Sequence, residues 1–325
     1  MPSHWSVFQF EGLEVFQVRL PLPFRLDHVF CYVVNSGGTW WIVDSGLGIP
    51  EAKELWDEFV KDVGIRWERI RGVYVTHYHP DHCGLVEWLQ ERSGARCFIS
   101  ATEAELVRIY WMDKVGASEA MVRLFLVHGM PARLAQDAAS AFFDTAQYVY
   151  PRARFSVLEA GRDVAVGRSN WSIVLAPGHS PGHLCFYNRR HGILISGDFL
   201  LPRISPNVGF WPFGEVNPLR SYLQSLWRVS LLDGRWVFPG HGQVFNEIRG
   251  RVRELLAHHE TRLARMKELV GSGATAFEVS QQVFGGDLSL HEMRFAMAET
   301  LAHLLYLVYL GRLSVAERGG CFVFK

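Results

Sequence analysis

The sequence has no net charge, no long apolar run and no paired cysteines. Its 325 residues hold 33 lysines and arginines against 33 aspartates and glutamates, so charge gives no support for a global field that attracts nucleic acid or membranes. The longest apolar run, residues 304–310, is too short to cross a bilayer, which takes about 20 residues. With a hydrophobic content of 49%, the chain fits an ordinary soluble globular protein.

The sequence shows neither a signal-peptide core nor a disulfide framework. Near the N-terminus, Glu11, Glu14 and Arg19 interrupt the apolar residues, so no signal-peptide core is visible. The cysteines are odd in number and form no CxxC pair: Cys31, Cys83, Cys97, Cys185 and Cys321. We therefore expect a reducing, cytoplasmic location.

Strand and helix patterns alternate through the first 248 residues and predict an α/β fold. Residues 101–150 differ, because apolar residues recur there at helical spacing, which predicts an insertion of two or three helices. From residue 249 the chain is helical, with a turn before a last apolar segment at 321–324. We predict an α/β domain over residues 1–248 and a C-terminal helical domain over residues 249–325.

Four potential metal ligands follow one apolar, β-branched run. Residues 73–76 lead into His77, His79, Asp81 and His82. Side chains two apart in an extended segment point the same way, so His77 and His79 pair. Asp81 and His82 fall where a helix should begin and diverge from that pair. Imidazole and carboxylate are preferred ligands of zinc and its neighbours, and the divergence suggests two metals side by side.

Further donors stand at the ends of later strands. The string Pro-Gly-His occurs twice after an apolar segment, ending at His179 and His241, and between them another strand ends in Gly197 and Asp198. The end of a buried strand fixes the position of a donor, and a preceding glycine lets the chain turn sharply. Together with the first four, these residues form an ordered series of ligands.

The series resembles the metallo-β-lactamase superfamily, whose HxHxDH box matches residues 77–82. The resemblance covers about residues 10 to 248 and implies a four-layer αββα sandwich with the metals at one edge. It implies that one ion is bound by His77, His79 and His179, the other by Asp81, His82 and His241, and that Asp198 bridges them. The resemblance also implies that Asp44 orients ligands from the end of an early strand; a capping or turn role for Asp44 stays open.

Departures from the family patterns favour one branch. Asp198 is not a cysteine, as in the best-known zinc β-lactamases, and His79 is not acidic, as in the di-iron flavoproteins. The residue three after Asp198 is Leu201, where the best-known quorum-signal lactonases carry tyrosine. The string from His179 to His183 is most similar to the glyoxalase II and thioesterase branch, although no glutathione-binding residues are evident after Asp198.

The C-terminal domain adds a second resemblance. Its order of helices and then a hairpin resembles a winged helix, as in the lactamase-like branch that includes a mitochondrial endoribonuclease. Its charges are nearly balanced, which does not favour a phosphate-binding surface. Packing, formation of a homodimer or closing of the pocket are the roles we expect, and nucleic-acid contact is the weaker alternative.

The expected activity is that of a dinuclear metallohydrolase. Two divalent ions, zinc by preference with iron or manganese open, would share a hydroxide that acts as the nucleophile. Asp81 is the candidate general base, and His183 is expected near the site without binding a metal. The substrate is expected to be a small carboxylic ester, thioester or lactone. The alternative is a metal-dependent phosphodiesterase or endoribonuclease acting on single strands.

Aromatic residues suggest an apolar substrate pocket. One group falls in the predicted insertion and another in the loop after Asp198, and the candidates are Trp111, Met112, Phe125, Met130, Phe210, Trp211 and Phe213. Core packing is the competing explanation for each of them. Cys83 and Cys185 are expected to be buried packing residues.

Overall fold

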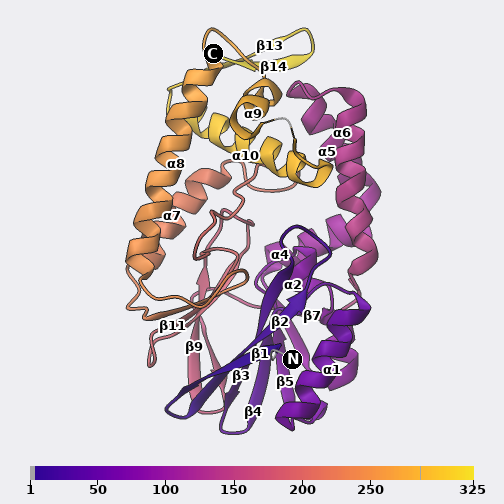
Figure 1. The fold of residues 1–325 in the computed structure, drawn as a ribbon, viewed down its shortest axis with the longest axis vertical. Helices are drawn as coiled ribbons and strands as arrows, with labels where there is room; N and C mark the ends of the chain where they lie inside the picture. The colour runs from indigo at the N-terminus through magenta and orange to yellow at the C-terminus, as the bar shows by residue number, and fades with distance from the viewer. Residues whose placement is uncertain (1–3, 286) are drawn as a thin grey trace.

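Two β-sheets face each other in the computed structural model, which describes residues 4–285 and 287–325 (Figure 1). The first sheet has seven strands in sequence order: β1 (Trp5–Phe10), β2 (Leu13–Pro21), β3 (His28–Ser36), β4 (Thr39–Val43), β5 (Ile70–Tyr74), β6 (Arg96–Ile99) and β7 (Phe155–Val157). The second has five, in the order β12 (Trp236–Pro239), β11 (Ile193–Gly197), β10 (Leu184–Asn188), β9 (Ser169–Leu175) and β8 (Asp163–Val166). Both sheets are mixed: β4 to β7 run parallel while β1 to β4 run antiparallel, and in the second sheet only β11 and β12 pair in parallel.

The facing sides of the two sheets share one apolar layer. Trp41 of β4 lies against Tyr74 of its own sheet and against Trp171 and Phe186 of the other, with ring centroids 4.5, 5.5 and 5.7 Å away. Alternate residues of a strand point to opposite faces, so Phe186 faces this layer while Tyr187 faces the outer helices.

Helices cover the outer face of each sheet. Against the first sheet pack α1 (Pro50–Val63) and α3 (Val86–Ser93), and against the second packs α7 (Pro218–Ser230). Phe59 of α1, for example, lies 5.6 Å from the ring of Phe16 in β2. The predicted four-layer αββα sandwich is confirmed.

The helical insertion is also present. It comprises α4 (Ala101–Val107), a π-helix (Arg108–Met112), α5 (Lys114–Val127), α6 (Ala132–Phe143) and a 3-10 turn (Asp144–Tyr148). Its helices do not simply cover the sandwich: α6 packs against the C-terminal helix α10 and α5 against the C-terminal hairpin (Figure 1).

The C-terminal part contains α8 (Ile248–Val270), α9 (Ala276–Phe284), α10 (Leu290–Tyr309) and a hairpin of β13 (Val315–Arg318) and β14 (Cys321–Phe324). Both α9 and α10 begin with a capping box, at Thr275 and Ser289, which fixes their first turns. The helical C-terminal domain is thus present, while its classification as a winged helix and the boundary at residue 248 stay predictions.

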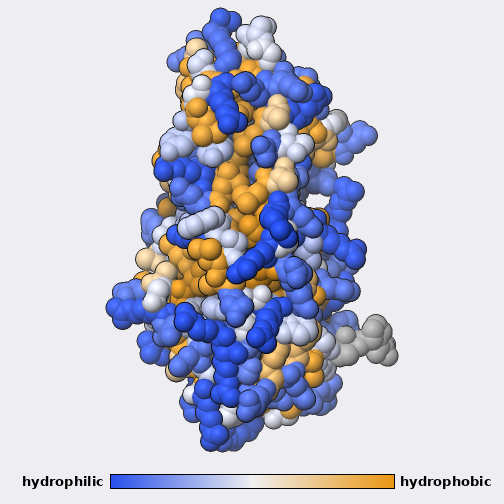
Figure 2. All heavy atoms as spheres, turned by 90° about the vertical axis from the view of Figure 1, so that its left-hand side faces the viewer, coloured by the Kyte–Doolittle hydropathy of each residue, from blue (hydrophilic) through white to orange (hydrophobic). Residues whose placement is uncertain are grey.

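Apolar side chains gather on the face that carries α7 and α8 (Figure 2). Trp227 and Leu231 of this region are 62% and 61% exposed, and Leu256 of α8 is 36% exposed. Within residues 4–285 and 287–325, no helix is both long and apolar enough to span a membrane.

Candidate metal centre

Strand β5 delivers the first four donors. It ends at Tyr74, three residues before His77, so the strand is shorter than predicted and an extended loop carries His77 and His79. His79 is the N-cap of α2 (Pro80–Cys83), which places Asp81 and His82 in its first turn. The predicted helix start is therefore confirmed, although α2 ends after four residues and α3 begins separately at Val86.

The other three donors also follow strands, as predicted. His179 lies beyond β9, Asp198 directly follows Gly197 at the end of β11, and His241 follows β12. Gly197 has φ +49°, in the left-handed region, which favours glycine. A Cβ atom on Gly240 would collide with Oδ1 of Asp198 and with the ring of His82, so the turn before His241 needs glycine for close approach.

Three histidine nitrogens converge in a first group. Nε2 of His77 lies 2.9 Å from Nδ1 of His79, and Nε2 of His179 lies 3.2 and 3.0 Å from these two atoms. Ligands at zinc–nitrogen distances in a tetrahedral site are separated by roughly 3.3 Å. The three rings thus stand close to the spacing that one bound ion requires.

A second group lies beside the first. Nε2 of His241 is 3.3 Å from Oδ2 of Asp81, and Nε2 of His82 is 3.7 Å from the same oxygen. Asp198 stands between the groups: its carboxylate is 3.3 Å from His82, 3.3 Å from His241 and 3.7 Å from His179. The structure brings all seven predicted ligands together, and one aspartate reaches both sets.

The nitrogens that face away from the centre are held by the protein. Nδ1 of His179 donates to the carbonyl oxygen of Asn207, and Nδ1 of His241 to that of His28, both at 2.8 Å. Nδ1 of His82 donates to Oδ2 of Asp44 at 2.9 Å. Such bonds fix the tautomer and orientation of a ligand and leave the other nitrogen free for a metal.

Asp44 connects the two groups. Its carboxylate accepts from the backbone N–H of Thr76 at 2.8 Å and from the Thr76 hydroxyl at 2.9 Å. That hydroxyl in turn lies 2.9 Å from Nδ1 of His77. Asp44 has φ +63° and is 1% exposed, a conformation that costs free energy for a residue other than glycine. The strained turn thus places the Asp44 carboxylate where it accepts hydrogen bonds from His82 of the second group and from Thr76, whose hydroxyl contacts His77 of the first group.

In the second group, the histidines and carboxylates shift one another's pKa values strongly. Burial alone would lower the pKa of His241, but Asp198 and Asp81 raise it to about 10. Burial would raise the pKa of Asp81, but His82 and His241 lower it to about 2. Two carboxylates, the buried Asp198 and the half-buried Asp81, therefore favour a positive charge at this point. In the protein alone a histidine proton supplies that charge, and a divalent cation would supply it in the same place.

Unpaired buried atoms mark the same point. Nε2 of His82 and Oδ1 of Asp198 face each other at 3.3 Å, but in the described residues neither atom has a hydrogen-bond partner of good geometry, an arrangement that is costly unless a ligand completes it. The chemistry of the donors, imidazole nitrogen and carboxylate oxygen, suits zinc, iron or manganese. By charge, spacing and donor type the residues fit a pair of divalent ions.

His183 lies outside the ligand groups, as predicted. It is fully buried, and its Nε2 accepts a hydrogen bond of 3.3 Å from the backbone N–H of Asp198. This hydrogen bond holds the backbone of Asp198 in place. Cys83 and Cys185 are buried free thiols, as expected.

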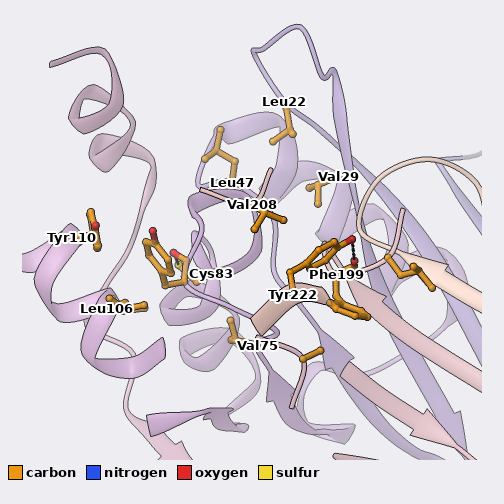
Figure 3. Close-up of a cluster of buried hydrophobic side chains, with 14 of the residues drawn as sticks. Leu22, Val29, Leu47, Val75, Cys83, Leu106, Tyr110, Phe199, Val208 and Tyr222 are labelled. Atoms are coloured by element: carbon orange, nitrogen blue, oxygen red, sulfur yellow. Dashed lines mark hydrogen bonds between the residues drawn. The ribbon is translucent and has the colours of Figure 1, made fainter. Parts of the chain in front are cut away.

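Apolar packing supports the ligand loops from behind. Figure 3 shows Val75, Cys83, Phe199, Val208 and Tyr222 around them, and the Tyr222 hydroxyl donates to the carbonyl oxygen of Phe199 at 3.1 Å. Because a packed core resists displacement, this layer limits how far the donors can move apart when no ion is bound.

Sequence reasoning missed Glu103, a fully buried acid in α4. Its carboxylate accepts from the backbone N–H groups of Tyr78, at 2.8 Å, and Gly182, at 2.6 Å, and from the hydroxyl of Ser180. Burial raises the pKa of Glu103 to about 7, against the effect of these hydrogen bonds. In the sequence, Ser100 three positions earlier makes Glu103 look like an ordinary helix-capping acid. Its contacts to two ligand loops come only with the fold.

An aromatic cleft lies beside the first ligand group. Tyr78, Tyr110, His179 and Trp211 are among its lining residues, together with residues 212–218 in part. Of the pocket residues predicted from sequence, Trp211 lines the cleft, and Trp111 stands behind it, donating from Nε1 to the Tyr78 carbonyl oxygen at 2.8 Å.

Within the described residues, Trp211 is the only one of the seven aromatic and methionine candidates that lines this cleft, so the prediction was wrong for the others, Phe210 included. Phe125 and Met130 are buried in the core and line no part of this cleft in the described residues. Met112 and Phe213 are 57% and 54% exposed. Tyr110, which the sequence did not single out, lines the cleft, and its hydroxyl donates to the carbonyl oxygen of Pro212 at 2.5 Å.

Two family models match the chain. One, described as Metallo-beta-lactamase superfamily, matches residues 25–241, and the other, described as Metallo-beta-lactamase-like, C-terminal domain, matches residues 263–325. The chain belongs to the metallo-β-lactamase superfamily. Its fold and its histidine and aspartate groups are those of a metallo-hydrolase, able to bind metal ions.

Several relatives are similar over nearly the whole chain. The "Probable metallo-hydrolase YqjP" of Bacillus subtilis is 26% identical, over 90% of this chain and 91% of that protein. An "Atrochrysone carboxyl ACP thioesterase" of Aspergillus fumigatus is 24% identical, over 82% of this chain and 71% of that protein. A crystal structure of a metallo-beta-lactamase family protein from Thermus thermophilus has TM-score 0.85 and 32% identity, covering 97% and 98% of the two chains. A beta-lactamase domain protein from Burkholderia ambifaria has TM-score 0.84 and 32% identity, over 100% and 95%.

Proposed function

We propose that the protein is a dinuclear metal-dependent hydrolase of small carboxylic esters, thioesters or lactones. The observation that carries this proposal is the shared position of Asp198, whose carboxylate oxygens lie 3.3 to 3.7 Å from histidines of both ligand groups. An acid in that position suits two ions rather than one. Both ions are proposed to be zinc, with iron or manganese as alternatives.

The ligands divide as follows in this proposal. One ion would be held by His77, His79 and His179 and the other by Asp81, His82 and His241, and Asp198 would serve both. When bound, such a pair of ions supplies a Lewis acid and a water whose pKa is lowered to about 7. The protein's own part is to keep these donors at fixed spacing and to move the proton.

Asp81 is proposed as the general base. Its side chain is 19% exposed, against 10% for Asp198 and 2% for Asp44, so it is the carboxylate of this cluster that water and substrate reach most easily. The pKa of about 2 keeps the Asp81 carboxylate ionised at neutral pH, but it also makes Asp81 a weak base by itself, so its proposed part in proton transfer rests on its position in the site. Its position beside His241 would stabilise that charge between turnovers.

The lining of the cleft supports an acyl substrate. Tyr78, Tyr110 and Trp211 line a cavity of about 10 Å³ next to His179, which is room for about one water, so an acyl chain would enter only as these rings move apart. Their apolar faces suit such a chain better than a polyanion. A relative named as a thioesterase is similar over 82% of this chain. We therefore place the protein nearest the glyoxalase II and thioesterase branch, and favour thioesters within the acyl class.

We also propose that residues 249–325 form a winged-helix-like domain whose role is to close this cleft. The loop after Asp198 rests on α10: the side chain of Asn207 donates to the Phe295 carbonyl oxygen at 3.3 Å, and the backbone N–H of Phe210 donates to that of Ala298 at 2.9 Å. Through these contacts the C-terminal domain would support one wall of the substrate site.

The test is turnover by the zinc-loaded full chain on a panel of p-nitrophenyl esters, thioesters, lactones, bis-p-nitrophenyl phosphate and RNA. We expect acyl cleavage, and loss of that cleavage in Asp198→Ala. Cleavage of phosphodiesters or RNA without acyl cleavage would favour the rival nuclease function and overturn the proposal. Full activity of Asp198→Ala would remove the dinuclear mechanism.

A further inference from the structure

Arg294 is a buried cation without a carboxylate partner. It lies in α10 and is 4% exposed, and in residues 4–285 and 287–325 no carboxylate oxygen comes within ion-pair distance of its guanidinium. Its Nε is buried without a hydrogen-bond partner, and its Nη2 lies 3.3 and 3.4 Å from the ring nitrogens of His291. Charged side chains are almost never fully buried unless they are paired, so Arg294 lacks a partner that its burial calls for.

Aromatic rings from three parts of the chain surround the guanidinium. Its Cζ lies 3.8 Å from the ring centre of Phe295, 4.3 Å from that of Phe142 and 5.6 Å from that of Trp211. Phe142 belongs to the insertion, Trp211 to the loop after Asp198, and Phe295 to α10. The rings attract the cation and hold it in place, but they carry no charge that neutralises it.

This cation stands next to the candidate active site. Burial lowers the pKa of Arg294 to about 9, while Tyr78, Asp81 and Tyr110 act in the opposite direction. All three belong to the site: Tyr78 and Tyr110 line the cleft, and Asp81 is a member of the second ligand group. Trp211, which contacts the guanidinium, lines the same cleft.

We propose that Arg294 binds a carboxylate group carried by the acyl part of the substrate. This inference rests on the proposed acyl hydrolase function and narrows its substrates to acids with a second, free carboxylate. A guanidinium fork matches the two oxygens of a carboxylate. The substrate carboxylate would give Arg294 the anionic partner that the described residues do not provide.

The charge balance favours a carboxylate over a phosphate. Arg294 offers one positive charge, and the other groups that act on it in the described residues are aromatic rings, two tyrosines, His291 and the ligand carboxylate of Asp81. Burial and Arg294 lower the pKa of His291 to about 4, so it adds no charge at neutral pH. A monoanion can be neutralised here, whereas a phosphate dianion would need a second cation.

Binding of simple acids tests the proposal without turnover. The zinc-loaded full chain is titrated with butyrate and with the diacids succinate, glutarate and adipate, and dissociation constants are measured by calorimetry. Butyrate and the diacids each offer one carboxylate to the ions, so the difference between their dissociation constants reports the contribution of the second carboxylate of the diacid. We expect at least one diacid to bind about tenfold or more tightly than butyrate, since hydrogen bonds to charged groups are strong. Equal binding of all four acids overturns the proposal.

Variants assign the preference to Arg294. In Arg294→Met the diacid should bind no better than butyrate, and Arg294→Lys, which keeps the charge but loses the fork, should retain part of the preference. The control is Arg25→Met, which removes an exposed guanidinium already paired with Glu292 of α10 at 2.9 Å. A preference that survives in both Arg294 variants overturns the proposal, and so does a tighter fit for 4-phosphonobutyrate than for glutarate.

Turnover separates this inference from the proposed function. The kcat/KM values of p-nitrophenyl butyrate and mono-p-nitrophenyl glutarate are compared, with the uncatalysed rate subtracted. Arg294→Met should lower kcat/KM for the glutarate ester by about tenfold or more and leave the butyrate ester nearly unchanged. Equal losses on both esters contradict the assignment to Arg294, whereas no acyl turnover by the wild type contradicts the proposed function.

Discussion

At the scale of single residues, the metal centre depends on side chains outside the two ligand groups. Asp44 joins these groups, because it accepts from His82 directly and is linked to His77 through the hydroxyl of Thr76. It keeps this place at φ +63°, a conformation that Asn and Asp tolerate better than most residues. We expect its charge, more than its shape, to matter for the ions.

Asp44→Asn tests that expectation. Asparagine can keep the left-handed turn but loses the negative charge opposite His82. Because loss of such a supporting contact typically weakens metal binding about 10- to 100-fold, we expect the second ion to be lost at a chelator concentration lower by about that factor. The first ion, on His77, His79 and His179, should be affected less.

Competition with a chromogenic chelator measures both steps. Asp57→Asn serves as the control, since Asp57 is an exposed acid on α1 that pairs with Arg92. Unchanged affinity for both ions in Asp44→Asn would contradict the role assigned to Asp44.

The ligands could be predicted from sequence, whereas most of their supporting residues could not. The donors stand in short motifs at strand ends, where the local pattern fixes both residue type and position. Glu103 and Arg294 look like a helix-cap acid and a helix-surface base in the sequence. Their surroundings come from segments tens to hundreds of residues away, which no local pattern encodes.

At the scale of elements, strand and helix positions followed the apolar periodicity closely. The apolar spacing in residues 50–63 predicts a helix, and the string Asn-Ser-Gly-Gly at residues 35–38 predicts a hairpin turn. These positions hold α1 and the turn between β3 and β4. The extended loop after Tyr74 was misread as strand because β-branched residues continue to Thr76. Strand β5 ends at Tyr74 because its backbone pairing with β4 and β6 ends there, and this pairing is set by the sheet and not by the local sequence.

Helix α4 holds two ligand loops in register through Glu103. We predict that Glu103→Gln lowers the free energy of unfolding of the metal-free protein by about 1–3 kcal/mol, because buried donors lose an ionised acceptor. Urea unfolding at pH 8 measures this difference. At that pH most of the wild-type side chains are ionised, since the pKa is about 7. Because folding raises this pKa, the wild type loses stability as the pH rises through 7, so the difference from Glu103→Gln should be larger at pH 6 than at pH 8.

A neighbouring acid on the same helix gives the matched control for this variant. Glu105 is exposed and pairs with Arg108, so Glu105→Gln should stay within about 0.5 kcal/mol of the wild type. Equal effects of the two substitutions would show that Glu103 does not connect the loops.

At the scale of the whole molecule, the sandwich, the insertion and the C-terminal helices share one core. Buried residues from α5, α7, α8 and α10, such as Phe125, Leu226, Val252 and Leu301, belong to the same contiguous cluster. The change to a helical pattern near residue 248, from which we predicted a boundary, therefore does not coincide with a break in this cluster.

We predict that the metal-free protein unfolds in one cooperative transition. Far-UV circular dichroism and tryptophan fluorescence should give coincident urea midpoints, because the parts are packed against one another and cannot lose contacts separately. All 11 tryptophans lie before residue 248, whereas the helices at the C-terminus contribute strongly to the dichroism. Two separate midpoints would contradict the shared core and support an independent domain at residues 249–325.

The central claim is that one chain binds two metal ions and needs both for acyl hydrolysis. The most direct measurement is metal content per chain by mass spectrometry, taken together with ester turnover, during stepwise removal and return of zinc. We predict two ions per chain in the wild type, activity that falls as either ion is removed and returns with zinc, and at most one ion in an inactive Asp198→Ala. Full activity with a single ion per chain, or with none, would contradict this account.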